Sequence, residues 1–229
     1  MRRYRTSLAL AAACLLASPG WAQVPPSAAQ ISRYTGLHAA AQRGDLAQLQ
    51  QLLGQKAELN SRDAQGRTPL HVATFARQPQ AVRLLAGAGA DLGLLENDRY
   101  DAVTIAAVAD DEATLATLLA LGASAQLTTS RYDGTALIAA AHLGHDGVVR
   151  QLIAASAPLD HVNNLHWTAL IESIVLGDGG PRHQRTLAAL VQAGANLQLS
   201  DRAGNTPLQL ARARGYREMV RMLESAGAK

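Results

Sequence analysis

The sequence predicts an all-α solenoid of about six helix-turn-helix repeats that carry short β-turn or hairpin fingers. The first observation is a short motif, clearest in Thr68-Pro69-Leu70-His71, whose copies begin at residues 35, 68, 101, 135, 168 and 206 and so return every 33 to 38 residues. The second observation is a marker such as Gly89-Ala90-Asp91 or Gly122-Ala123-Ser124, which recurs in phase with the motif. A fixed period of this length is typical of a solenoid, in which each repeat packs on its neighbours.

The first 22 residues have the layout of a secretory signal peptide. Three arginines (Arg2, Arg3 and Arg5) precede an apolar run over 7–17, and the small residues Gly20 and Ala22 predict cleavage after Ala22. The apolar run is about eleven residues long, which is too short to span a bilayer as a helix. We therefore expect a periplasmic or secreted protein, with retention of the segment as an anchor as the alternative.

The rest of the chain divides into a leader and the repeats. Residues 23–30 contain two prolines and small residues, which predicts a flexible leader. The repeat domain over 31–229 is expected as repeats at about 31–60, 61–93, 94–126, 127–160, 161–198 and 199–229.

Each repeat is expected to begin with a short helix packed between its neighbours. In the second repeat, Thr68 can cap the exposed amides and Pro69 suits the first turn. Ala73 is small because this helix is squeezed on both sides. The second helix carries the larger apolar residues, as in Leu49, Leu52 and Leu53. A glycine such as Gly89 then supplies the left-handed residue that ends the helix.

The fifth repeat has extra residues over 177–184, between its two helices. Such an insertion maps to a loop, which is either merely tolerated or part of a contact site.

The segment Asp63-Ala64-Gln65-Gly66-Arg67-Thr68-Pro69-Leu70-His71 resembles the ankyrin repeat, whose signature is T-P-L-H-x-A. The sixth repeat matches it nearly as well, whereas the third to fifth lack the proline and the third has Asp101 in place of the threonine. The resemblance implies a β-turn and two antiparallel helices per repeat. It also implies that His38 and His71 tie loop backbones together, and that the protein binds partners through a concave face.

Composition argues against several other classes of function. The formal net charge of +3 comes from the three arginines of the signal segment, so the chain from Gln23 onward is close to neutral and lacks the basic stripe that nucleic acids require. The single cysteine, Cys14, also lies in that segment, which leaves no thiolate site for a metal. No catalytic or nucleotide-binding motif is present. We expect no enzymatic activity, cofactor or metal, and no membrane insertion after cleavage.

Candidate contact residues are those at the turn tips and on the outward side of the first helices, which line the concave face in this family. Aromatic and arginine side chains are the types that anchor interfaces, although each ring could instead pack on the next turn. The candidates are Arg67, Phe75, Tyr100, Tyr132, His142, Trp167, Glu172 and Asn205.

These observations together predict a monomeric protein-binding module in the periplasm. One interpretation is a factor that supports or stabilises an exported enzyme, in stress defence for example. The alternatives are an immunity-type inhibitor of a toxic enzyme and a scaffold at the cell envelope.

Overall fold

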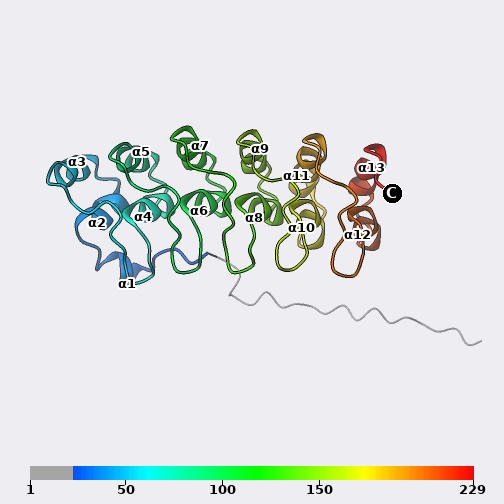
Figure 1. Ribbon diagram of the computed structural model, residues 1–229, viewed down its shortest axis with the longest axis horizontal. Coiled ribbons are helices and arrows are strands. Elements are labelled where there is room, and N and C mark those ends of the chain that lie inside the picture. Colours follow the sequence, from blue (N-terminus) through cyan, green and yellow to red (C-terminus); the bar gives the residue numbers. More distant parts are fainter. Residues whose placement is uncertain (1–22) are drawn as a thin grey trace, which may run out of the picture.

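The computed structural model describes residues 23–229, so the expected signal peptide over 1–22 lies outside the described residues. Helix pairs stack side by side along one axis, with the first helices in one row and the second helices in the other (Figure 1). Turns that we call fingers project from the row of first helices, on the side away from the second row (Figure 1). The expected all-α solenoid of helix-turn-helix repeats is confirmed.

The described chain holds one short leading helix and six helix pairs. The leading helix is α1 (Ala28–Ile31). The first helices are α2 (Gly36–Arg43), α4 (Pro69–Phe75), α6 (Ala102–Val108), α8 (Ala136–Leu143), α10 (Ala169–Val175) and α12 (Pro207–Ala213). The second helices are α3 (Leu46–Gly54), α5 (Pro79–Gly87), α7 (Glu112–Ala120), α9 (Asp146–Ala154), α11 (Pro181–Gln192) and α13 (Arg217–Ser225).

The fingers are turns with little sheet character. Between residues 23 and 229 the only β pairing is an isolated antiparallel bridge that joins Thr129 to Gly134. The expected hairpin character is therefore limited to this one finger.

The first helices begin as the motif predicts. Pro69 occupies the first turn of α4, and the Thr68 side chain accepts a hydrogen bond from the His71 amide. The departure at Asp101 is accommodated, because its Oδ1 accepts from the Thr104 amide at 2.9 Å and caps α6 in the same way.

The core lies between the two rows of helices. The small residues Ala73, Ala106 and Ala140 of the first helices are fully buried, as are Leu49 and Leu118 of the second helices. Each buried leucine contributes about 1.5–3 kcal/mol relative to an exposed one. No single repeat could bury these side chains alone, so the stability of the solenoid resides in the stacking.

The second helices end at a residue in the left-handed conformation. Gly89 and Gly122 have φ values of 97° and 90°, as the sequence predicts. Lys56 and Ser156 occupy the same place in the first and fourth repeats with φ values of 58° and 61°. These two residues adopt a conformation that side chains disfavour.

The leader over 23–30 contacts the repeats. The Ser27 side chain and Gln30 form a capping box on α1, and Pro26 is buried. Arg67 donates from Nη2 to the carbonyl oxygen of Val24 at 2.7 Å. From α1 the leader runs back along the fingers (Figure 1). These contacts tie the leader, for which the sequence predicts a flexible segment, to the finger of the second repeat.

Over the described range, 23–229, no helix combines the length and the apolar character that a membrane span requires.

Candidate protein-binding face

Each of the second to sixth repeats carries one finger, which we number by its repeat. We define the finger face as the surface formed by these five fingers and the first helices behind them. Every finger is built around one side-chain acceptor that receives two backbone amides, from the residues two and four positions later. In the second repeat Asp63 Oδ1 accepts from Gln65 at 2.9 Å and from Arg67 at 2.8 Å. The corresponding acceptors in the other fingers are Glu96, Ser130, Asn163 and Asp201. This turn gives the five tips a common shape.

Neighbouring fingers are joined by backbone hydrogen bonds. The amide of Asn97 donates to the Gln65 carbonyl at 3.0 Å, and the amide of Ser130 donates to the Arg99 carbonyl at 2.8 Å. Asn164 likewise donates to the Tyr132 carbonyl at 3.0 Å. The second to fifth fingers therefore form a continuous row whose shape is fixed without a partner.

Ion pairs add to this row between the third and fourth fingers. Arg99 Nη1 lies 3.1 Å from Asp133 Oδ1, and Arg131 Nη2 lies 2.5 Å from Asp98 Oδ1. All four side chains are about half exposed, so each pair contributes at most about 1 kcal/mol to stability. The charges neutralise one another on the middle of the finger face.

The fourth residue after each acceptor is the tip position just before the first helix. It is occupied by Tyr100 and Trp167, which are both half-buried, and by Asn205, whose amide donates to the Asp201 carboxylate at 3.2 and 3.1 Å. Tyr132 is half-buried two positions earlier in its turn, where Gly134 takes the tip position. These four candidates all lie on fingers, and each keeps some exposed surface.

Arg67 holds the same tip position but is covered. Only 4% of the residue is exposed, because its guanidinium lies under the leader, 3.7 Å from Asp63 and 5.5 Å from the centroid of the Phe75 ring. The structure thus brings the candidates Arg67 and Phe75 together. Arg67 links the leader to the second finger, and we correct its assignment as an exposed contact residue.

Glu172 and His142 are also brought together. Glu172 Oε1 accepts from Asn163 Nδ2 at 2.8 Å, and its Oε2 lies 3.6 Å from His142 Nδ1. Burial raises the pKa of Glu172 to about 8 and lowers the pKa of His142 below its usual value. With 4% of its surface exposed, Glu172 is not the outward residue that the sequence analysis expected, whereas His142 keeps 31% of its side chain exposed.

Histidines of the repeat motif tie loops together, as the family resemblance implies. His38 Nε2 lies 2.9 Å from the Arg67 carbonyl, and His71 Nε2 lies 2.9 Å from the Leu94 carbonyl. His71 Nδ1 accepts from the Thr68 amide at 3.0 Å, so its Nε2 carries the proton. Burial lowers the pKa of His71 to about 4, which keeps it neutral at physiological pH.

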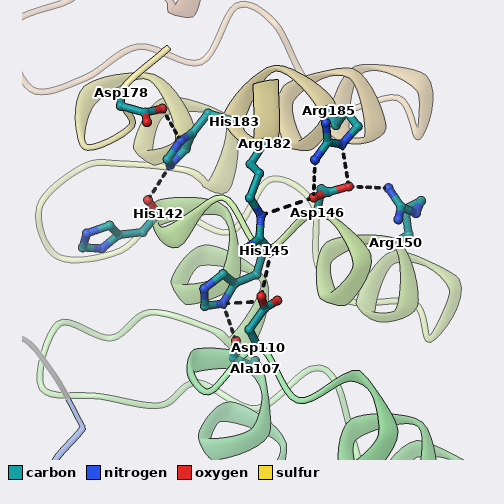
Figure 2. A network of polar contacts seen from close by, with 10 residues as sticks. All are labelled: Ala107, Asp110, His142, His145, Asp146, Arg150, Asp178, Arg182, His183 and Arg185. Atoms are coloured by element: carbon teal, nitrogen blue, oxygen red, sulfur yellow. Dashed lines mark hydrogen bonds and ion pairs between the residues drawn. The ribbon is translucent and has the colours of Figure 1, made fainter. Parts of the chain in front are cut away.

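The insertion in the fifth repeat lengthens α11, and side chains of this helix form ion pairs with residues of earlier repeats (Figure 2). Arg182 Nη2 lies 2.8 Å from Asp110 Oδ2, and Arg182 Nε lies 3.6 Å from Asp146 Oδ1. Asp146 Oδ2 also accepts hydrogen bonds from Arg185 Nε and Arg150 Nη1, each at 2.9 Å. These arginines lower the pKa of Asp146 to about 2. The insertion is therefore a structural link across three repeats.

His183 completes this link. Its Nδ1 lies 2.8 Å from Asp178 Oδ1 and its Nε2 lies 2.9 Å from the His142 carbonyl (Figure 2). This network was not predicted from the sequence. Its one visible signal was an insertion that contains an arginine and a histidine, with a second arginine directly after it at Arg185.

No group of three or more histidine, cysteine, aspartate or glutamate side chains that could hold a metal ion occurs in the part of the chain from residue 23 onward.

Family models match the repeats along most of the chain. A model described as ankyrin repeats (3 copies) matches residues 11–96, 37–129 and 103–201, and one described as ankyrin repeats (many copies) matches residues 181–224.

Individual proteins show the same similarity. The chain is 34% identical over 190 residues to the ankyrin repeat protein YahD of Escherichia coli K12, and the match covers 82% of this chain and 94% of YahD. The crystal structure of an ankyrin repeat domain from Acinetobacter baumannii AYE is 45% identical, with a TM-score of 0.80 over 84% of this chain and 98% of that domain.

A more distant structure is the Bdellovibrio bacteriovorus predatory endopeptidase Bd0816 in complex with the immunity protein Bd3460. The matched chain is 24% identical, with a TM-score of 0.66 over 84% of this chain and 98% of that chain, a level that shows a shared fold alone.

Proposed function

The chain belongs to the ankyrin repeat family, and from that premise we propose that it is an exported module that binds another protein through the finger face and supports or stabilises an exported enzyme. Ankyrin repeats are protein-protein interaction modules and are in general not catalytic. The proposal therefore concerns which surface binds, where in the cell, and with what effect on the partner.

The observation that carries the proposal is the row of fingers joined by backbone hydrogen bonds. The bonds from Asn97, Ser130 and Asn164 to the preceding fingers fix the relative positions of the tips in the absence of a partner. A preformed surface loses little conformational entropy on docking. The aromatic residues Tyr100 and Trp167 stand at two of these tips, and such side chains commonly dominate binding energy.

Export is supported by the sequence. The arginines, apolar run and small residues of the first 22 positions favour cleavage after Ala22, and the chain from Gln23 onward contains no cysteine. A chain without thiols suits an oxidising compartment. The mass and N-terminal sequence of the protein recovered from the periplasm test this part directly. A mature N-terminus at Gln23 supports it, and an intact N-terminus in the cytoplasmic fraction contradicts it.

A second candidate function is an immunity-type inhibitor that blocks a toxic exported enzyme. The Bdellovibrio complex, which pairs an endopeptidase with an immunity protein, supports only the compatibility of this fold with such a complex, because the identity is low. The two roles differ in their effect on the partner. The purified partner enzyme should keep its activity longer with a helper present, whereas an inhibitor should abolish activity at one molar equivalent.

A further inference from the structure

Glu172 is an acid at a position that is apolar in every other repeat. Counted from the residue that caps each first helix, the corresponding residues are Ala39, Val72, Ile105, Ala139 and Leu210. Glu172 is 4% exposed, and an ionised carboxylate without a counter-charge is costly to bury. Packing of the solenoid does not require an acid here, because the other five repeats have an alkyl side chain at this position and pack in the same way.

A second substitution accompanies the first. The finger acceptor is a carboxylate at Asp63, Glu96 and Asp201, but it is an amide at Asn163 in the repeat that carries Glu172. The amide accepts the Trp167 backbone N–H with its oxygen at 3.0 Å and donates to Glu172 Oε1 at 2.8 Å. An ionised carboxylate at position 163 has no proton to donate and could not form this bond. The finger of this repeat is therefore adapted to hold the acid in place.

One oxygen of Glu172 remains without a hydrogen bond. Within residues 23–229 Oε2 makes no hydrogen bond, and it lies 3.6 Å from His142 Nδ1, which is beyond hydrogen-bonding distance. The His142 ring, in turn, makes no hydrogen bond in the described chain and is partly exposed, so it can turn aside. Such a rotation would open Oε2 to a group arriving on the finger face.

The neighbourhood also lacks a positive charge. His142 on α8 is kept neutral, because burial, His183 and His145 all lower its pKa. Burial and the Asn163 hydrogen bond set the pKa of Glu172, and neither α11 nor α12, which both pack on α10, adds a charge to it. The carboxyl group therefore holds a proton at neutral pH, and only an external cation can stabilise its ionised form.

We propose that Glu172 and His142 form a recognition site for a basic side chain of the partner, an arginine or lysine that displaces the His142 ring and pairs with Glu172 Oε2. This inference rests on the proposed function, since it names the chemistry that the finger face accepts. The carboxyl proton passes to solvent as the cation enters. The backbone amide of Trp167 donates to the same Asn163 side chain, and its ring is half-buried. A tryptophan ring can stack on a cation.

The probe is Nα-acetyl-arginine amide, with its neutral isostere Nα-acetyl-citrulline amide as the comparison. NMR at neutral pH follows the side-chain amide of Asn163 and the carboxyl carbon of Glu172. The proposal predicts saturable shifts with the arginine compound and none with the citrulline compound. Because binding requires loss of a proton, the affinity should rise about tenfold or more between pH 6 and pH 8.5.

Three variants give the controls. Glu172→Gln should abolish the response, and Glu58→Gln, at an exposed acid on the other end of the solenoid, should leave it unchanged. His142→Lys supplies an internal cation and should also abolish the response while Glu172 is still present. Equal shifts with both compounds, or a full response in Glu172→Gln, would overturn the site. If Glu172→Gln nevertheless binds the natural partner like wild type, the proposed function stands and this inference fails.

Discussion

At position 172 a carboxyl group is buried where five other repeats place alkyl side chains, and the consequence is a dependence of stability on pH. The pKa of Glu172 is raised from 4.5 to about 8 in the folded state. Below pH 4.5 both states keep the proton, so burial costs little. As the pH rises toward 8 the unfolded chain ionises and the folded chain does not, so stability falls.

Glu172→Gln should remove this loss. The variant should match wild type near pH 4.5 and exceed it by roughly 2–4 kcal/mol at pH 8, because glutamine keeps the shape and accepts the Asn163 hydrogen bond without a charge to bury. Urea denaturation from pH 4.5 to 9 measures the difference. His142 acts below pH 6.5 with the opposite sign and is common to both proteins. Parallel stability curves would show that Glu172 is ionised in the folded state.

The motif histidines allow a matched comparison. His71 is buried and bonds to both Thr68 and the Leu94 carbonyl, whereas His38 is partly exposed and bonds to the Arg67 carbonyl. We expect His71→Ala to cost about 2–4 kcal/mol and His38→Ala about 1 kcal/mol. The folded pKa of His71, about 4 against 6.5, also means that wild type loses stability as the pH falls from 6.5 to 4, and His71→Ala should lose less. Similar costs for the two variants would contradict the structural role of His71.

Some residue roles were predictable from the sequence and others were not. The loop-tying role of His38 and His71 follows from their place in the repeat motif. The burial of Arg67 does not, because it depends on the carbonyl of Val24 in a leader that no repeat pattern describes. Glu172 was selected because it was expected on the outward side of its helix, and that placement could not show that Asn163 turns toward it.

At the scale of the helices, one residue that ends a second helix has a strained backbone conformation, and this strain can be tested. Ser156 stands where Gly89 and Gly122 stand in other repeats, and its φ of 61° is left-handed. Ser156→Gly should stabilise the protein by about 0.5–1 kcal/mol, because relief of the left-handed strain exceeds the added entropy of glycine in the unfolded chain. Thermal unfolding measures the change. Ser200→Gly, at an exposed loop position outside the left-handed region, should stabilise nothing.

The helix α11 offers the second prediction at this scale. Asp146 is held by Arg150 and Arg185, which lower its pKa from 3.8 to about 2. Asp146→Asn should cost about 1–2 kcal/mol at neutral pH, since the arginine partners are half exposed and the charge-assisted bonds are lost. Stability from this group is present above pH 3.8 and is lost as the pH falls through 2, so the deficit of the variant should shrink on acidification. A deficit that is independent of pH would contradict the ion-pair account.

The elements themselves were predictable from the period, because apolar spacing, caps and terminal glycines all recur with it. The network at α11 was not, since it brings Arg182 to Asp110 across 72 positions in the chain. An insertion length reveals where residues are added. It does not reveal that the added turn points back along the solenoid.

For the whole molecule, the period determines the stacking of helix pairs and therefore the existence of a finger face. The central claim is that this face binds a partner protein, and the most direct test is affinity capture with three forms of the chain. These are wild type, the variant Tyr100→Ala/Tyr132→Ala/Trp167→Ala on the fingers, and the variant Gln50→Ala/Arg83→Ala/Thr116→Ala at exposed positions of the second helices. Circular dichroism confirms that each form is folded at the temperature of the experiment.

The account predicts that wild type and the second-helix variant enrich the same protein from a periplasmic extract, and that the finger variant loses it by at least about tenfold. Equal capture by all three folded forms, or loss only in the second-helix variant, would contradict the assignment of binding to the finger face.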